Sequence, residues 1–125
     1  MKKEIKSEKA PGAIGPYSQA VKAGDYVYVS GQLPIDVKTG LMPREIKEQT
    51  RQSLENIRHI LEEAGLNMDN VVKSTVYLSD MSLFAPMNEV YGEFFTGIYP
   101  ARAAFAVKEL PKQALVEIEV VAFQG

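Results

Sequence analysis

Apolar residues recur at helical spacing in two segments of the chain. From Ile46 to Ala64 they lie three or four residues apart, which places them on one stripe of a helix, and Gly65 is typical of the position just beyond a helix end. A second helix is predicted to begin near Ser82 as its N-cap, with Pro86 tolerated in the first turn. The apolar face of this second helix is expected to comprise Met87, Val90, Tyr91, Phe94 and Phe95.

The first third of the chain favours short strands. Residues 3–8 are compatible with an edge strand, and residues 18–23 and 26–30 flank the turn dipeptide Gly24-Asp25, which indicates a β-hairpin. Two segments rich in glycine and proline are expected to be connectors: residues 10–16 and residues 31–44.

Three further strands are predicted later in the chain, at residues 71–78, 101–107 and 115–123. The first of these is expected to place Val72, Val76 and Leu78 on one side. The order is then strands, helix, strand, helix, strands. We therefore predict an α+β fold with two helices packed on one face of a mixed β-sheet, and a chain of 125 residues fits one domain over residues 1–125.

Composition narrows the possible chemistry. The chain has no cysteine, which excludes a disulfide framework, a thiolate nucleophile and a cysteine-based zinc site. The only histidine, His59, is expected to face solvent, so neither a metal site nor a Ser-His-Asp triad is predicted. A net charge of −2 with scattered lysines gives no reason to expect nucleic-acid binding. No apolar run approaches the ~20 residues of a membrane span, so we expect a soluble cytoplasmic protein.

The strongest candidates for chemistry lie near the C-terminus. Arg102 is a lone guanidinium among small apolar residues, and Glu117 and Glu119 project from one face of the last strand. If the two last strands are antiparallel neighbours, the arginine and a glutamate come close. One interpretation is a structural ion pair. The other is an arginine that binds a substrate carboxylate and a glutamate that transfers a proton.

Other polar and aromatic residues are candidates for a pocket. Tyr17 follows Gly15-Pro16 in a loop, and Ser30 precedes Gly31 at a strand end. A structural role in a turn is the more common explanation for each of these residues taken alone, but a phenol, a hydroxyl and a bare glycine backbone also line small polar pockets. Phe84 and Asn88, one turn apart on the second helix, are candidates for a further wall, with core or capping roles as the alternative.

Several short blocks of the chain are distinctive in order and spacing. They are Ala10-Pro11-Gly12-Ala13-Ile14-Gly15-Pro16-Tyr17-Ser18-Gln19, Val29-Ser30-Gly31-Gln32-Leu33-Pro34, Lys38-Thr39-Gly40, Gln52-Ser53-Leu54-Glu55-Asn56-Ile57 with Glu63-Ala64-Gly65, Pro100-Ala101-Arg102, and Leu110-Pro111-Lys112 with Val116-Glu117-Ile118-Glu119. Together these blocks resemble the RidA (YjgF) family, whose members also carry the older names endoribonuclease L-PSP and translation initiation inhibitor.

The resemblance implies a chorismate-mutase-like fold and a homotrimer with its sites in clefts between subunits. It also implies cofactor-free hydrolysis of 2-imino acids, such as 2-iminobutyrate and 2-iminopropanoate, to 2-keto acids and ammonia. Arg102 would hold the substrate carboxylate, and Glu117 would position or activate water. The expected pocket residues are Tyr17, Ser30, Gly31, Phe84, Asn88 and Ala104. Many active members have a cysteine where this chain has Ala104.

Two rival functions stay open from the sequence. One is a non-catalytic trimer that binds small metabolites and regulates a partner, which would need Arg102 but not Glu117. The other is the endoribonuclease or translation inhibitor of the older names, which the absence of a basic cluster disfavours.

Overall fold

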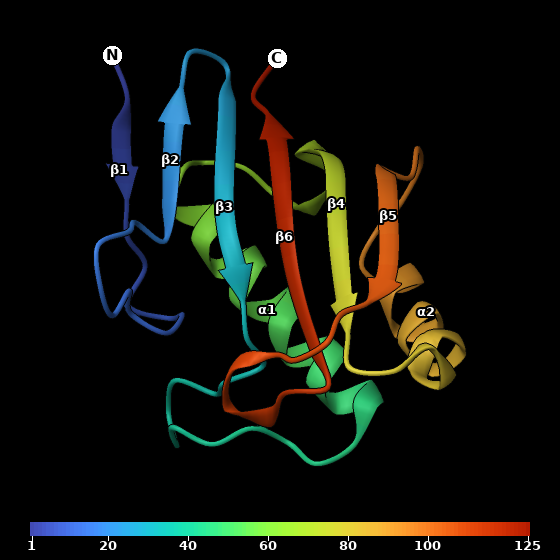
Figure 1. Cartoon of the computed structure of the whole chain (residues 1–125). Coiled ribbons are helices and arrows are strands. Elements are labelled where there is room, and N and C mark those ends of the chain that lie inside the picture. The colour runs from blue at the N-terminus through green and yellow to red at the C-terminus, as the bar shows by residue number, and fades with distance from the viewer.

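Six strands form one mixed sheet, and two helices cover one of its faces, in the computed structural model of residues 1–125 (Figure 1). The strands are β1 (Lys3–Ile5), β2 (Ala20–Ala23), β3 (Tyr26–Gln32), β4 (Val71–Leu78), β5 (Ala101–Ala106) and β6 (Val116–Phe123), and the helices are α1 (Ile46–Glu63) and α2 (Phe84–Gly92). In space the strands follow the order β1-β2-β3-β6-β4-β5. Only β4 and β5 pair in parallel; every other pair is antiparallel. The predicted α+β class and helix layer are confirmed.

Both helices lie on one face because each one connects two parallel strands. α1 joins β3 to β4, and α2 joins β4 to β5, so the chain steps across the sheet in the same direction twice. Connections of this kind share one handedness, and two steps in one direction then place both crossovers on the same face. The other face of the sheet carries no helix.

The long helix α1 has the predicted extent and a well-defined end. Gly65 adopts a positive φ of 76°, and its N–H donates to the Glu62 carbonyl at 2.9 Å. The next N–H, that of Leu66, donates to the Leu61 carbonyl at 2.9 Å. These two bonds form a Schellman motif, which satisfies carbonyls that the last turn of a helix leaves unpaired.

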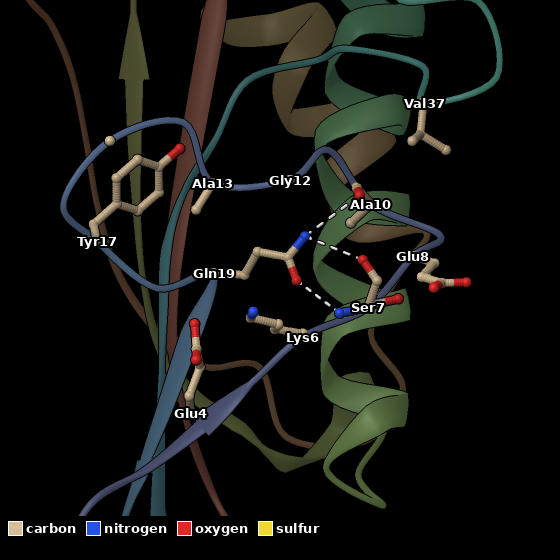
Figure 2. Close-up of a pocket in the computed structure, with 11 residues that line it drawn as sticks. Glu4, Lys6, Ser7, Glu8, Ala10, Gly12, Ala13, Tyr17, Gln19 and Val37 are labelled. Atoms are coloured by element: carbon tan, nitrogen blue, oxygen red, sulfur yellow. Dashed lines mark hydrogen bonds between the residues drawn. The ribbon is translucent and has the colours of Figure 1, made fainter.

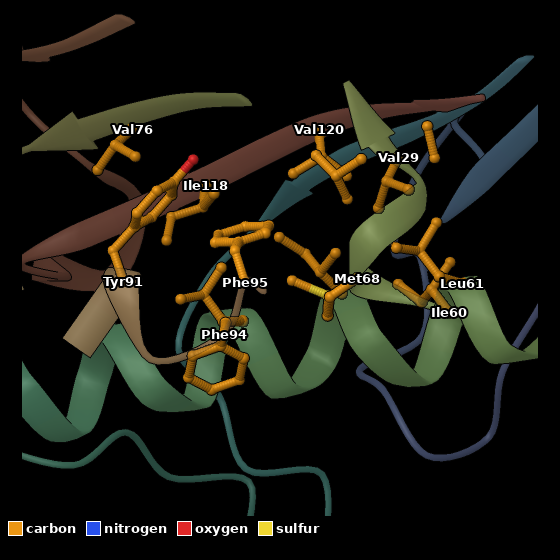
Figure 3. Packing of buried hydrophobic residues seen from close by; sticks show 14 of the residues in the cluster. Val29, Ile60, Leu61, Met68, Val76, Tyr91, Phe94, Phe95, Ile118 and Val120 are labelled. Atoms are coloured by element: carbon orange, nitrogen blue, oxygen red, sulfur yellow. The ribbon is translucent and has the colours of Figure 1, made fainter. Parts of the chain in front are cut away.

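The core lies between the helices and the central strands. Inward side chains of β3, β4 and β6 meet the apolar stripe of α1 and the buried residues in and after α2 (Figure 3). Members from these elements include Val29, Val76, Ile118, Val120, Ile60, Leu61, Tyr91, Phe94 and Phe95. The alternation of β6 is complete, because Val116, Ile118, Val120 and Ala122 are buried while the residues between them are not.

The placement of the last two strands corrects one expectation. β5 and β6 are not neighbours, because β5 pairs with β4, and β6 is inserted between β3 and β4. The connection between them crosses the end of β4. At that crossing the Val107 N–H donates to the Leu78 carbonyl, and the Ser79 N–H donates to the Leu115 carbonyl.

Smaller differences have local causes. Val72 is exposed rather than aligned with Val76 and Leu78, because the pairing of β4 with β6 shifts register between Val71 and Lys73. The cap before the second helix is Asp80, not Ser82: the Asp80 carboxylate accepts from the Ser82 N–H at 2.8 Å and starts a short 3-10 turn.

Phe94 and Phe95 are buried as predicted, although α2 ends at Gly92. Neither helix is both long enough and apolar enough to cross a membrane.

A buried hydroxyl on α1 supplies the first testable prediction. Ser53 is fully buried, and its Oγ has no hydrogen-bond partner. We expect Ser53→Ala to raise the free energy of unfolding by about 1 kcal/mol, because it removes an unsatisfied polar group and alanine is the better helix former. The matched control is Ser74→Ala, which should destabilise the protein because it breaks a 2.6 Å bond to the Tyr91 hydroxyl. Urea unfolding measures both, and a destabilised Ser53→Ala would contradict the prediction.

Candidate active site

Arg102 lies on the edge strand β5 and is held entirely by neutral groups. Its Nη1 donates to the Asn88 side-chain oxygen at 2.7 Å. The guanidinium carbon lies 4.7 Å from the centre of the Tyr91 ring and 5.4 Å from that of Phe84, both on α2. Arg102 forms no ion pair with any carboxylate of the chain. Most of its five N–H donors are therefore free for an external anion.

The aromatic support of this arginine is itself anchored in the core. Tyr91 is buried, and its hydroxyl hydrogen-bonds the buried Ser74 hydroxyl at 2.6 Å. Burial raises the pKa of the Tyr91 phenol, so the ring stays neutral beneath the guanidinium. Arg102 and Asn88 open onto a pocket of about 520 Å³ that is also lined by Tyr99. The arrangement is suited to a carboxylate, which a guanidinium binds through two parallel hydrogen bonds.

Glu117 lies in a separate cleft of about 730 Å³. It shares that cleft with three predicted pocket residues: Tyr17, Ser30 and Gly31. Burial raises the pKa of the Glu117 carboxyl, and the nearby charge of Glu119 raises it further. A carboxyl whose pKa is moved toward neutrality can both accept and return a proton, which is what acid–base catalysis requires.

A β-bulge brings the Glu117 carboxylate against Gly31. Val29 pairs with Val120 and Gln32 pairs with Ile118, so β3 advances by three residues over a stretch in which β6 advances by two. The extra residue lies at Ser30–Gly31, where the sequence predicts the end of a strand and the start of a connector. A Cβ at position 31 would overlap the Glu117 side chain, so only glycine allows this approach without displacing the carboxylate.

Strained backbone borders the same cleft. Lys112 and Gln113 both have positive φ, 57° and 60°, which is uncommon for residues with a side chain. Lys112 and Pro111 line the Glu117 cleft. Strain of this kind is concentrated at functional sites.

The predicted site residues thus form two groups that one chain does not bring together. Arg102 points to the helix face of the sheet, with Phe84 and Asn88, whereas Glu117 lies on the open face. β4 separates their strands, and Glu117 lies opposite Tyr77, which pairs with Phe105 rather than Arg102. The interpretation of a structural ion pair between Arg102 and one of the two glutamates, Glu117 or Glu119, is therefore wrong within the chain.

Ala104 lies two residues beyond Arg102 on β5, opposite Val76, and packs against the core.

Some residues of the two groups were missed or given another role from the sequence. Tyr91 was expected only as a core residue, because helical periodicity does not show that its ring also supports Arg102. Gln19 and Lys112 fall inside distinctive blocks but were not singled out, although both line the Glu117 cleft. The position of Lys112 next to a proline was the available signal for an unusual backbone.

Comparisons with known proteins agree with this architecture. A family model described as Endoribonuclease L-PSP matches residues 7–124. A RutC family protein of Pyrococcus horikoshii is 55 % identical over 99 % of both chains. The mouse 2-iminobutanoate/2-iminopropanoate deaminase is 48 % identical over 100 % of this chain and 93 % of its own. The crystal structure of Escherichia coli TdcF with bound serine superposes with a TM-score of 0.95 at 43 % identity, covering 98 % of this chain and 99 % of that one.

The mixed six-stranded sheet with two helices on one face defines the class of protein as a two-layer α+β sandwich. Within that class, the chain belongs to the endoribonuclease L-PSP family, which includes the RidA (YjgF) proteins. The family resemblance drawn from the sequence blocks is confirmed.

The environment of Glu117 predicts a pH-dependent change of stability. A carboxyl whose pKa is raised on folding binds more protons in the folded than in the unfolded chain, so stability falls as pH rises from the usual carboxyl pKa through the raised one. Glu117→Gln removes this loss. We expect the variant to be more stable than the wild type at neutral pH and to lose that advantage below about pH 4. Thermal unfolding across this pH range tests the sign, and equal curves at every pH would contradict it.

Proposed function

We propose that this protein is a hydrolytic deaminase that converts reactive 2-imino acids, including 2-iminobutyrate and 2-iminopropanoate, to 2-keto acids and ammonia. The observation that carries the proposal is the pair of unmatched groups: Arg102 is a cation without an acidic partner, and Glu117 is a carboxyl with a raised pKa in a cleft. The name of the mouse relative, which is nearly half identical along the whole chain, supports the same activity.

The chemistry follows from these two groups. Arg102 binds the substrate carboxylate through two N–H donors and fixes the orientation of the imine carbon. Glu117 takes a proton from a water molecule as the water oxygen bonds to that carbon and the C=N π electrons move to nitrogen. Glu117 returns that proton to nitrogen, which gives a carbinolamine. Glu117 then takes the proton of the new hydroxyl group and passes it to the amine nitrogen, so that the C–N bond breaks, the C=O bond forms and ammonia leaves. Proton transfer of this kind contributes about 10²–10⁴-fold to rate.

The remaining predicted residues shape the pocket. Tyr17 and Ser30 line the Glu117 cleft, and Gly31 makes room for its carboxylate. Asn88 and Phe84 hold the guanidinium on the other side. Ala104 leaves a small side chain near Arg102, and imine hydrolysis needs water and a proton carrier rather than a thiol at that position. The serine bound to E. coli TdcF supports a small amino-acid-like ligand, since serine carries the same carboxylate.

The complete site is assembled between copies of the chain, in a homotrimer. Arg102 and Glu117 lie on opposite faces of one sheet, so a single substrate can reach both only if they come from different copies. The helix-free face supplies a surface for such contact, because it exposes aromatic residues that one chain leaves uncovered: Tyr26, Tyr28, Phe105 and Phe123. A contact between an edge and a face is heterologous, and such a contact closes a ring of three copies when it relates neighbours by a third of a turn.

The binding-only alternative is distinguished by Glu117. A module that captures keto acids needs the arginine, but it does not need a half-buried carboxyl facing the cleft, where a negative charge disfavours anions. The family model also carries the name endoribonuclease. Neither pocket contains a histidine that could act as an acid or base on RNA, and the chain's net charge of −2 does not favour binding of a polyanion.

Kinetics in a coupled assay test the two roles. A threonine dehydratase generates the imine, and its decay is followed with each variant. Arg102→Ala should lower kcat/KM roughly 10- to 100-fold, and Arg102→Lys should restore only part of it, because a point charge lacks the planar fork. Glu117→Gln should keep 2-ketobutyrate binding while hydrolysis falls about 100-fold or more.

Arg58→Ala is the matched control for the arginine, since Arg58 also stacks on an aromatic ring, 4.9 Å from the centre of Phe94, but outside both pockets. Its kinetics should match the wild type. Undiminished turnover in folded Glu117→Gln would remove that residue from the mechanism. Wild-type protein that binds 2-ketobutyrate without speeding imine decay would favour the binding module.

Mixed assemblies test whether the site spans two copies. Arg102→Ala and Glu117→Gln chains, each inactive alone, are unfolded together and refolded in equal amounts. If one copy supplies the arginine and the next the glutamate, about a quarter of the sites receive both intact residues, and about a quarter of wild-type activity returns. Light scattering should give the mass of a trimer. No recovery in refolded mixed trimers, or a monomeric mass at micromolar concentration, would overturn the shared site.

A further inference from the structure

The loop that forms one wall of the Glu117 cleft has almost no backbone hydrogen bonds of its own. Within residues 7–18 a single backbone–backbone bond occurs, from the Tyr17 N–H to the Gly15 carbonyl at 2.9 Å. The same segment nevertheless contributes four residues to the cleft wall: Pro11, Gly12, Ile14 and Tyr17. Since unpaired loops are mobile, something else must hold this wall in place.

The side-chain amide of Gln19 supplies the missing bonds. Gln19 is only 3 % exposed, and Figure 2 shows its amide reaching back into the loop just before β2 begins. Its Oε1 accepts from the Ser7 N–H at 2.7 Å. Its Nε2 donates toward the carbonyls of Ser7, Ala10 and Pro11, at 3.1, 3.3 and 2.7 Å. One amide therefore ties together both ends of the turn over residues 7–11.

The backbone around Gln19 also connects this turn to the bulge beside Glu117. The Gln19 carbonyl accepts from the Ser30 N–H at 2.9 Å, and the Ser18 carbonyl accepts from the Ser30 hydroxyl at 2.6 Å. Tyr17 precedes these two anchored residues directly. Its side chain is 53 % exposed and has no hydrogen bond of its own, so its position depends on the chain on either side.

We propose that Gln19 is a positioning residue of the deaminase reaction, which holds the 7–17 loop so that Tyr17 is presented to the substrate. The inference rests on the proposed function. Although Gln19 lines the cleft, its amide is engaged with the loop backbone, so its polar atoms are not available to bind the substrate. Gln19 affects catalysis indirectly, by fixing the positions of Tyr17 and of the cleft-lining residues Pro11 and Ile14 that precede it.

The chemistry of the amide explains why this residue type is needed. The site requires an acceptor for one N–H and donors for the surrounding carbonyls at the end of one side chain. A primary amide offers both, because its oxygen accepts and its two N–H groups donate, one of them shared between two of the three carbonyls. A glutamate would keep the acceptor but turn a second acceptor toward the carbonyls. A methionine of similar length would fill the space and make none of the bonds.

The test compares Gln19→Met with Gln49→Met. Gln49 is also a buried amide at 4 % exposure, and it also bonds two distant backbone groups, the Pro43 carbonyl and the Leu115 N–H at 2.8 Å each. Neither of those residues lines the cleft. Both variants should lose stability by similar amounts. Only Gln19→Met should raise KM for the imine, about tenfold, with the pH profile of kcat unchanged because Glu117 is untouched.

A double variant shows whether the effect passes through Tyr17. If it does, Gln19→Met added to Tyr17→Ala should raise KM little beyond Tyr17→Ala alone, since coupled residues are not additive. Fully additive effects, or an equal KM increase in Gln49→Met, would overturn the positioning role. If Gln19→Met does not fold, Gln19→Glu takes its place. Its KM defect should shrink as pH falls, because the protonated carboxyl regains one donor, and a defect independent of pH would count against the proposal.

The positioning role and the proposed function fail separately. Calorimetric binding of 2-ketobutyrate needs no turnover. A wild-type protein that binds the keto acid but does not hydrolyse the imine would overturn the proposed deaminase activity. In that case, weaker binding of the keto acid by Gln19→Met but not by Gln49→Met would still support the positioning role. Unchanged binding and unchanged KM in folded Gln19→Met would sink the positioning role alone.

Discussion

The alternation of side chains on the central strand β6 is the constraint on which both the core and the site depend. Its inward residues, such as Ile118 and Val120, are sealed under α1 and α2, and this pins the register of the strand. Because a strand has a period of two, the same register forces Glu117 onto the open face. The bulge at Ser30–Gly31 then lets the carboxylate approach the neighbouring strand. Core packing therefore determines where the candidate catalytic group lies.

The edge strand β5 presents the guanidinium of Arg102 without an acidic partner, so this cation remains available to an external carboxylate. An acidic partner for Arg102 within the chain would compete with any substrate carboxylate. Arg102 instead lies over the rings of Tyr91 and Phe84 and bonds the neutral amide of Asn88. These contacts orient the guanidinium without neutralising it. The salt bridges of the chain lie elsewhere. Three lie within α1, and two join α1 to Glu89 on α2 or to Glu93 just beyond it.

Buried side-chain amides hold the loops that the sheet does not reach. Gln19 anchors the turn over residues 7–11, and Asn56 donates to the carbonyls of Leu33 and Ile35, which follow the bulge. Residues 33 and 35 line the same cleft as Glu117. The walls of the cleft are irregular chain, and amides replace the missing ladder bonds there because they offer a donor and an acceptor together.

The sequence by itself determined the elements, the fold class and the identity of the chemical groups. Helical and strand periodicities located α1, β4, β5 and β6 to within a residue or two, because burial imposes them locally. The resemblance of the blocks selected Arg102 and Glu117. Only the tertiary structure decided that β6 lies between β3 and β4, which places these two residues on opposite faces. Strand order depends on contacts between segments far apart in the chain, and local periodicity carries no information about which strand becomes the neighbour of which.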